Sequence, residues 1–224
     1  MDRWFVRGGR LNAIMDTNTV ERYLLALADG MGGHNSGEVA SSDVLHNLQY
    51  FFSDMPVGLS IGDFNEAIYE WLASINITID AKGRSDERFN KMGTTLVALA
   101  YYGGAFYWMN CGDSRIYRLH EGMLTQLSTD HSLSTLLGQD KHSNVITNCI
   151  GGGCKSSYID IVECTPDVQP GDTFLICSDG LSDMVSDELI AAWLIDGYDA
   201  ESLCTEAEEA GGKDNVSAIV VRVL

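Results

Sequence analysis

The sequence predicts an α+β domain, in which antiparallel strands and helices occupy separate parts of the chain. Residues 94–127 contain short apolar runs separated by glycine-containing turns, a pattern typical of antiparallel hairpins. Helical periodicity occurs before this region and again near the carboxyl end. A Rossmann-type fold would alternate single strands with helices, so this grouping favours an α+β architecture.

One strand and two helices are expected first. Residues 21–28 (ERYLLALA) predict a strand that ends at Asp29. Ser36 is expected to cap a helix that runs through Phe52. A second helix is expected from Asp63, because the apolar residues that follow it recur at spacings of three and four and form one face.

Most of the strands come after a polar loop, which is expected at residues 82–91. The strands are expected at residues 94–102, 105–111, 115–120, 123–127, 158–164, 173–177 and 216–223. Between the last two strands we expect one helix from Ser186 through Ile195 and another from Asp199 through Ala210. The 224 residues contain no repeat or linker, so we expect a single domain over residues 1–224.

The charge of the chain excludes some partners. Lys and Arg number 14 against 32 Asp and Glu, which gives a net charge of −18. Such a chain would be repelled by the phosphates of nucleic acid or of an anionic membrane, so we expect neither as a partner. Acidic surface residues are often only solubilising, so the charge alone does not predict a metal site.

The sequence favours a cytoplasmic protein. It has no basic segment followed by an apolar one at its start, and no apolar run approaches the roughly 18 residues of a membrane span. The six cysteines include no C-x-x-C pair, which argues against a zinc site. Cys111 and Cys177 lie within apolar runs and are expected to be buried.

Three short acidic blocks carry the strongest functional signal. They lie at residues 28–34, 178–180 and 213–215, each beside a predicted strand, and contain Asp29, Asp179 and Asp214. Carboxylates at three strand ends can converge on one point, and the usual reason for gathering them is a hard divalent cation. A single Asp-Gly pair is also a common turn, and glycine-rich loops before helices bind phosphate in other proteins.

Six segments together resemble the metal-dependent protein phosphatases (PPM family, type 2C) in their compact bacterial form. They occur in the order of the family and extend from about Glu21 to the end of the chain. The segments are residues 28–40, 92–95, 112–115, 130–132, 178–183 and 213–216.

The resemblance implies a fold and a metal centre. The fold would be a four-layer αββα sandwich of two antiparallel sheets flanked by helices, with two Mn²⁺ or Mg²⁺ ions at one edge. Asp29 would bridge the two ions, the Gly30 carbonyl would bind one, and Asp179 and Asp214 would hold the other. Two further acids match the ligands of a third, weaker ion in bacterial relatives: Asp113 and Asp183.

The implied reaction is the hydrolysis of phosphoserine and phosphothreonine in proteins that a serine/threonine kinase has phosphorylated. Two ions roughly 3.5–4 Å apart can lower the pKa of a bridging water, which attacks phosphorus directly. No phosphorylated enzyme forms, so no cysteine nucleophile is needed. The histidines His34 and His131 could each act as a general acid or only hold loops in place, whereas Arg115 is interpreted as one half of a structural ion pair.

The amino-terminal motif of the family is altered in this chain. Arg10 is the expected phosphate-binding residue, with Arg7 as its rival. Ile14 lies where the family has an acid, and Asp16, two residues further on, is a potential substitute. The segment 131–153 is shorter than the flap of bacterial relatives, which predicts an open site that accepts many phosphopeptides.

Two alternatives to a protein phosphatase stay open at this stage. A pseudophosphatase would bind a phosphoprotein or a regulatory partner without turnover, and only the altered amino-terminal motif favours it. The same scaffold could also hydrolyse a small phosphate ester. No feature of the sequence indicates an oligomeric state.

Overall fold

The computed structural model describes residues 9–32, 34–138 and 145–224. The strands are β1 (Arg22–Leu27), β2 (Gly30–Met31), β3 (Gly93–Thr94), β4 (Leu96–Tyr102), β5 (Ala105–Cys111), β6 (Arg115–His120), β7 (Met123–Gln126), β8 (Ile150–Gly151), β9 (Asp160–Glu163), β10 (Thr173–Cys177) and β11 (Ala218–Arg222). The α-helices are α1 (His34–Asp54), α2 (Ile61–Ser85), α3 (Leu133–Leu136), α4 (Asp179–Ser182), α5 (Asp187–Ile195) and α6 (Ala200–Glu209).

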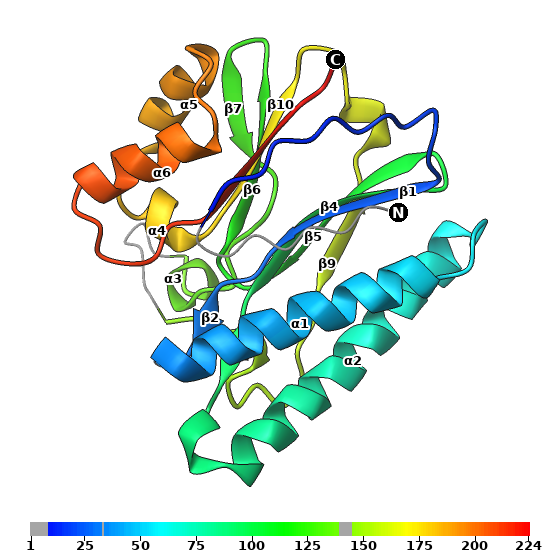
Figure 1. Cartoon of the computed structure of the whole chain (residues 1–224), viewed down its shortest axis with the longest axis vertical. Helices are drawn as coiled ribbons and strands as arrows, with labels where there is room; N and C mark the ends of the chain where they lie inside the picture. The colour runs from blue at the N-terminus through cyan, green and yellow to red at the C-terminus, as the bar shows by residue number, and fades with distance from the viewer. Residues whose placement is uncertain (1–8, 33, 139–144) are drawn as a thin grey trace.

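Two antiparallel sheets form the centre of the molecule. One has the order β1-β4-β5-β9 and the other β11-β10-β6-β7. Helices α1 and α2 cover the outer face of the first sheet, and α5 and α6 lie against the second (Figure 1). This arrangement confirms the α+β class and the αββα sandwich.

The alternation of apolar side chains along the strands produces the layers. In β4, Leu96 and Ala98 pack with the residues of α1 and α2, whereas Val97 faces the other sheet. In β10, Ile176 faces the first sheet and Leu175 packs with the residues of α5 and α6. Successive side chains of a strand point to opposite faces, so each central strand contributes to two cores.

The helix boundaries differ from the expected ones at three places. Helix α2 begins at Ile61 with Ser60 as its N-cap, because the Ser60 hydroxyl accepts from the Asp63 N–H at 3.2 Å, so Asp63 is not the cap. The helix continues to Ser85, whereas the sequence predicted that a polar loop begins at residue 82. Helix α1 likewise begins before Ser36, whose hydroxyl donates to the Gly32 carbonyl.

The expected row of hairpins is divided between the two sheets. The pairs β4–β5 and β6–β7 are antiparallel hairpins as predicted, but β5 and β6 belong to different sheets. The chain crosses between them at residues 112–114, where Gly112 has a φ of +124°. The small sheet β2-β3-β8 was not predicted, because two-residue strands carry no periodicity.

The described helices include none with an apolar stretch long enough to cross a membrane.

Candidate metal centre

The sheet topology brings the three acidic blocks to one edge of the sandwich. Strands β10 and β11 are antiparallel with Cys177 opposite Ala218, so the segment that begins at Asp179 lies beside the one that contains Asp214. Strand β1 packs across the sandwich against β10 and β11 and is followed by Asp29. The three aspartates therefore come from strand ends that face one another, and their role as metal ligands stays a prediction.

Two threonines hold the backbone of Asp29. The Asp29 N–H donates to Thr95 Oγ1 at 3.0 Å, and the Thr95 N–H donates to the Asp29 carbonyl at 2.8 Å. The Thr94 hydroxyl donates to the same carbonyl at 2.8 Å. Thr95 Oγ1 also lies 2.8 Å from the Ser114 hydroxyl, and Ser114 follows Asp113 directly. Through these contacts Thr95 connects the loop of Asp29 to the loop of Asp113.

Glycines allow the site loops to approach each other backbone to backbone. A Cβ at Gly30 would lie 2.1 Å from the carbonyl oxygen of Gly37 in α1. A Cβ at Gly180 would lie 2.2 Å from the carbonyl oxygen of Asn215. The hydroxyl of Ser178 reinforces the second approach, because it accepts from the Ser217 N–H at 3.1 Å. The glycines of these two Asp-Gly pairs therefore do more than form a turn: they allow close backbone packing beside Asp29 and Asp179.

We expect Gly180→Ala to separate the loops of Asp179 and Asp214. The added methyl group has to displace the Asn215 carbonyl, because contacts to real Cβ atoms essentially never fall below 3.0 Å. We expect the free energy of unfolding to fall by about 1–3 kcal/mol and manganese to bind more weakly. Calorimetric titration with Mn²⁺ and thermal unfolding measure the two effects. The control is Gly62→Ala, where an added Cβ would meet only Ser60 Oγ, at an ordinary contact distance of 3.8 Å; equal losses of metal affinity in both variants would contradict the packing argument.

The electrostatics of the site depend on a cluster of acids. The pKa of Asp29 is raised by burial, by repulsion from Asp179 and a hydrogen bond with it, and by repulsion from Asp214 and Asp113. Burial also raises the pKa of Asp179, and repulsion from Asp183 and Asp214 adds to this increase. The five predicted carboxylate ligands therefore act on one another in the folded protein. Negative charges gathered in this way are unfavourable unless protons or cations offset them.

The donor set fits a hard divalent cation. Every predicted ligand is an oxygen, the atom that Mg²⁺ and Mn²⁺ prefer. Among the described residues, Asp179 Oδ1 is buried and has no hydrogen-bond partner, as expected for an oxygen that binds a cation. As the side chains stand, no three His, Cys, Asp or Glu residues in the described ranges form a group that could hold an ion. The fit therefore depends on the donor chemistry and on the unpaired oxygen.

The guanidinium of Arg10 is paired with an acid outside the predicted ligand set. It forms an ion pair with Glu201 of α6, and its side chain is 72% exposed. Ile14 is exposed, and the Asp16 carboxylate accepts from the Asn18 N–H at 2.9 Å within its own turn. The rival Arg7 lies outside the described residues. The role of Arg10 in binding phosphate stays a prediction.

The imidazole of His131 connects three loops. Its Nδ1 accepts from the Gly112 N–H at 3.0 Å, and its Nε2 lies 3.0 Å from Asp160 Oδ2. The Asn148 side-chain nitrogen lies 2.8 Å from the same Nδ1. With both ring nitrogens engaged, the geometry supports the loop-holding alternative for His131. The side chain of His34 and residues 139–144 of the flap lie outside the described residues.

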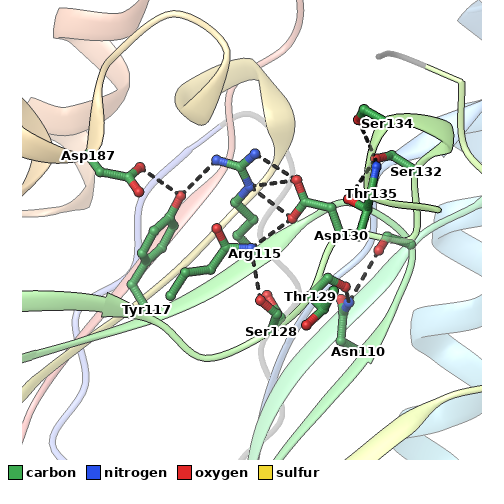
Figure 2. A network of polar contacts seen from close by, with 12 residues as sticks. Asn110, Arg115, Tyr117, Ser128, Thr129, Asp130, Ser132, Ser134, Thr135 and Asp187 are labelled. Atoms are coloured by element: carbon green, nitrogen blue, oxygen red, sulfur yellow. Dashed lines mark hydrogen bonds and ion pairs between the residues drawn. The ribbon is translucent and has the colours of Figure 1, made fainter. Parts of the chain in front are cut away.

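Arg115 forms the structural ion pair that the sequence indicated. Its guanidinium donates from Nε and Nη2 to the Asp130 carboxylate, at 2.6 Å for the shortest contact (Figure 2). Its Nη1 donates to the Tyr117 hydroxyl at 3.0 Å, which donates in turn to Asp187 at 3.1 Å. These contacts engage all three guanidinium nitrogens, and the side chain is 13% exposed, so the structure supports the ion-pair interpretation of Arg115.

Comparisons with known proteins found a matching family model and similar relatives. The family model described as protein phosphatase 2C matches residues 13–215. The serine/threonine protein phosphatase PstP of Mycobacterium tuberculosis is 36% identical over 211 residues, which are 90% of this chain but 40% of that protein. The chain thus spans less than half of the length of this relative.

Two solved structures are similar over almost the whole chain. The S. agalactiae serine/threonine phosphatase has a TM-score of 0.82 and 30% identity, and the match covers 91% of this chain and 88% of that one. The catalytic domain of PstP in complex with two manganese ions has a TM-score of 0.69 and 32% identity, with 98% and 94% covered.

Proposed function

Because this chain belongs to the protein phosphatase 2C family, we propose that it is a metal-dependent phosphatase that hydrolyses phosphoserine and phosphothreonine in proteins. The observation that carries the proposal is the cluster of carboxylates around Asp29 and Asp179 at facing strand ends. The two manganese ions of the similar PstP domain support a metal role for these acids. The proposed substrate is a phosphoprotein that a serine/threonine kinase has modified.

Each proposed ligand has a separate task. Asp29 would contact both Mn²⁺ or Mg²⁺ ions, the Gly30 carbonyl would bind one of them, and Asp179 with Asp214 would hold the other. When bound, these ions would activate water as the nucleophile and offset negative charge on the phosphate. The aspartates stay ionised and hold their positions, and no side chain forms a bond to phosphorus. A weaker third ion is proposed at Asp113 and Asp183.

The test compares two substrates under two metal conditions. Hydrolysis of p-nitrophenyl phosphate and of a phosphothreonine peptide is measured with Mn²⁺ and with a chelator. We expect both substrates to turn over with Mn²⁺ and neither with the chelator. Binding of the phosphopeptide without turnover under any metal condition would instead identify a pseudophosphatase. A sugar phosphate is then assayed as a third substrate, and its turnover without turnover of the peptide would identify a small-ester phosphatase.

A pair of variants tests the proposed phosphate contact of Arg10. If Arg10 leaves Glu201 to bind the substrate phosphate, Arg10→Ala should raise KM by about tenfold, the equivalent of one charge-assisted hydrogen bond. Glu201→Ala should not raise KM, because it releases Arg10 from its ion pair. Steady-state kinetics with the phosphopeptide separate the two. Unchanged KM in Arg10→Ala would remove Arg10 from the site.

A further inference from the structure

Two cysteines lie close together beside the metal centre and take no part in the proposed reaction. Cys149 Sγ and Cys154 Sγ are 3.1 Å apart, and both cysteines are free thiols. A disulfide needs about 2.05 Å between its sulfur atoms, so a movement of about 1 Å would join them. A thiol pair at this separation is a different case from a lone cysteine.

The loop between the thiols holds them in this position. Its three glycines, at 151–153, have φ angles of +75°, +62° and +86°, which let the four residues between the thiols turn back on themselves. Buried Asn76 of α2 fastens the loop at both ends: its Oδ1 accepts from the Gly151 N–H at 2.7 Å, and its Nδ2 donates to the Cys154 carbonyl at 3.1 Å. The backbone therefore presents one thiol to the other.

The loop is connected to the metal centre through the small sheet. Strand β8, which follows Cys149 directly, pairs with β3, and β3 pairs with β2, which begins at Gly30. The space between the loop and β2 is too small for a side chain at Gly152, because a Cβ there would lie 2.8 Å from Cys149 Sγ and 3.3 Å from Met31 Sδ. A change in the position of Cys149 Sγ is therefore expected to displace Met31, which follows the proposed metal ligand Gly30.

The two thiols are unequal in a way that suits stepwise oxidation. Cys154 is partly exposed, whereas Cys149 is 3% exposed and its thiol donates to the Gly151 carbonyl at 3.4 Å. Burial and the neighbouring Cys154 raise the pKa of Cys149, which keeps it protonated until a partner forms. An oxidant from solution therefore meets Cys154 first, and Cys149 is placed to react second.

We propose that Cys149 and Cys154 are a redox modification site, at which a peroxide converts the two thiols into a reversible disulfide. The Cys154 thiolate attacks one oxygen of hydrogen peroxide, and a sulfenic acid forms while the other oxygen leaves as water. Cys149 then attacks the sulfenic sulfur, loses its proton and releases a second water as the S–S bond forms. Two thiols and one peroxide give one disulfide and two waters.

Mass spectrometry of the peroxide-treated full chain tests the site without any measurement of activity. Free thiols are blocked after treatment, and the digested peptides are mapped. We expect the peptide that contains both cysteines to lose two hydrogens and to regain them with dithiothreitol. In Cys149→Ser, Cys154 has no resolving partner and should proceed to sulfinic acid. The matched control is Cys204→Ser, since Cys204 is also partly exposed but should leave the disulfide unchanged.

Two results would overturn the assignment. One is a disulfide between other cysteines or between two chains. The other is equal sulfinic acid at Cys154 in the unchanged chain and in Cys149→Ser, which would mean that Cys149 never resolves the intermediate.

A second readout asks whether the disulfide controls the proposed phosphatase, and this part rests on the proposed function. We expect peroxide to lower turnover reversibly in the unchanged chain and in Cys204→Ser, but not in Cys154→Ser. Full turnover of a chain whose disulfide is complete would show that the pair does not control the metal centre. A chain without phosphatase activity in any state would refute the proposed function, while the peptide map would still decide the modification site.

Discussion

Replacing Asp29 with asparagine is expected to remove the phosphatase activity while leaving the protein folded and more stable in the presence of a chelator. The amide keeps the size of the side chain, and the hydrogen bonds from Thr94 and Thr95 go to the backbone of residue 29, so the local structure should persist. The amide cannot supply the charge that two proposed ions share. We expect turnover to fall by about a thousandfold, which corresponds to about 4 kcal/mol of lost transition-state stabilisation.

The expected gain in stability follows from the raised pKa of Asp29. Burial and the neighbouring acids make the folded protein hold this proton more tightly than the unfolded chain does. In a chelator, stability should therefore fall as the pH rises from about 4, the ordinary value for aspartate, through the raised pKa of the folded state. Asparagine has no such charge, so near pH 8 the variant should be more stable by about 1–2 kcal/mol.

Urea unfolding at pH 5 and pH 8 in a chelator measures this difference. The stability of the unchanged protein should fall more steeply between the two values than that of Asp29→Asn. Asp167→Asn is the control, because Asp167 is an exposed aspartate outside the cluster. Activity in Asp29→Asn at the level of the control would refute the metal assignment, and parallel stability profiles would refute the electrostatic one.

The elements with strong periodicity could be predicted from the sequence. The strands at Ala105–Cys111, Arg115–His120 and Thr173–Cys177 begin and end where the apolar runs and glycine turns indicated. The position of α5 was also predicted correctly, because a serine suited to cap a helix, Ser186, stands directly before an apolar run. The crossing from β5 to β6 could not be predicted, because the periodicity of a hairpin does not say which sheet the next strand joins.

The acidic residues of the candidate site were predictable, whereas the groups that hold them were not. An aspartate beside a strand end is visible in the sequence, but the approach of Gly180 to Asn215 joins residues far apart in the chain. The same is true of Thr95 beneath Asp29 and of Glu201 beside Arg10. Long-range contacts of this kind follow from the packing of the two sheets, which no local pattern encodes.

The second large effect is expected at Arg115, whose replacement by methionine should destabilise the fold by about 3–5 kcal/mol. The Arg115–Asp130 pair is largely buried, with side-chain exposures of 13% and 8%. Removing the guanidinium leaves the Asp130 carboxylate desolvated and without this counter-charge, although the Gln126 amide still donates to it at 2.8 Å. Thermal unfolding should occur about 6–20 °C lower, at about 2–4 °C per kcal/mol for a domain of this size.

The chain offers a matched control for this effect in the Arg88–Asp86 pair. There, Nε and Nη2 of the arginine contact the carboxylate as in the buried pair, again at 2.6 Å, but the arginine side chain is 80% exposed. Exposed pairs contribute about 0–1 kcal/mol, so Arg88→Met should leave the unfolding temperature almost unchanged.

A double variant then separates the charge left behind from the lost packing. In Arg115→Met with Asp130→Leu no carboxylate remains buried at this position, and replacing a buried ion pair by apolar residues is often nearly neutral. The second substitution should therefore recover most of the stability that the first removes. If Arg115→Met and Arg88→Met are equally mild, or if the double variant is less stable than Arg115→Met alone, then burial does not set the strength of this pair.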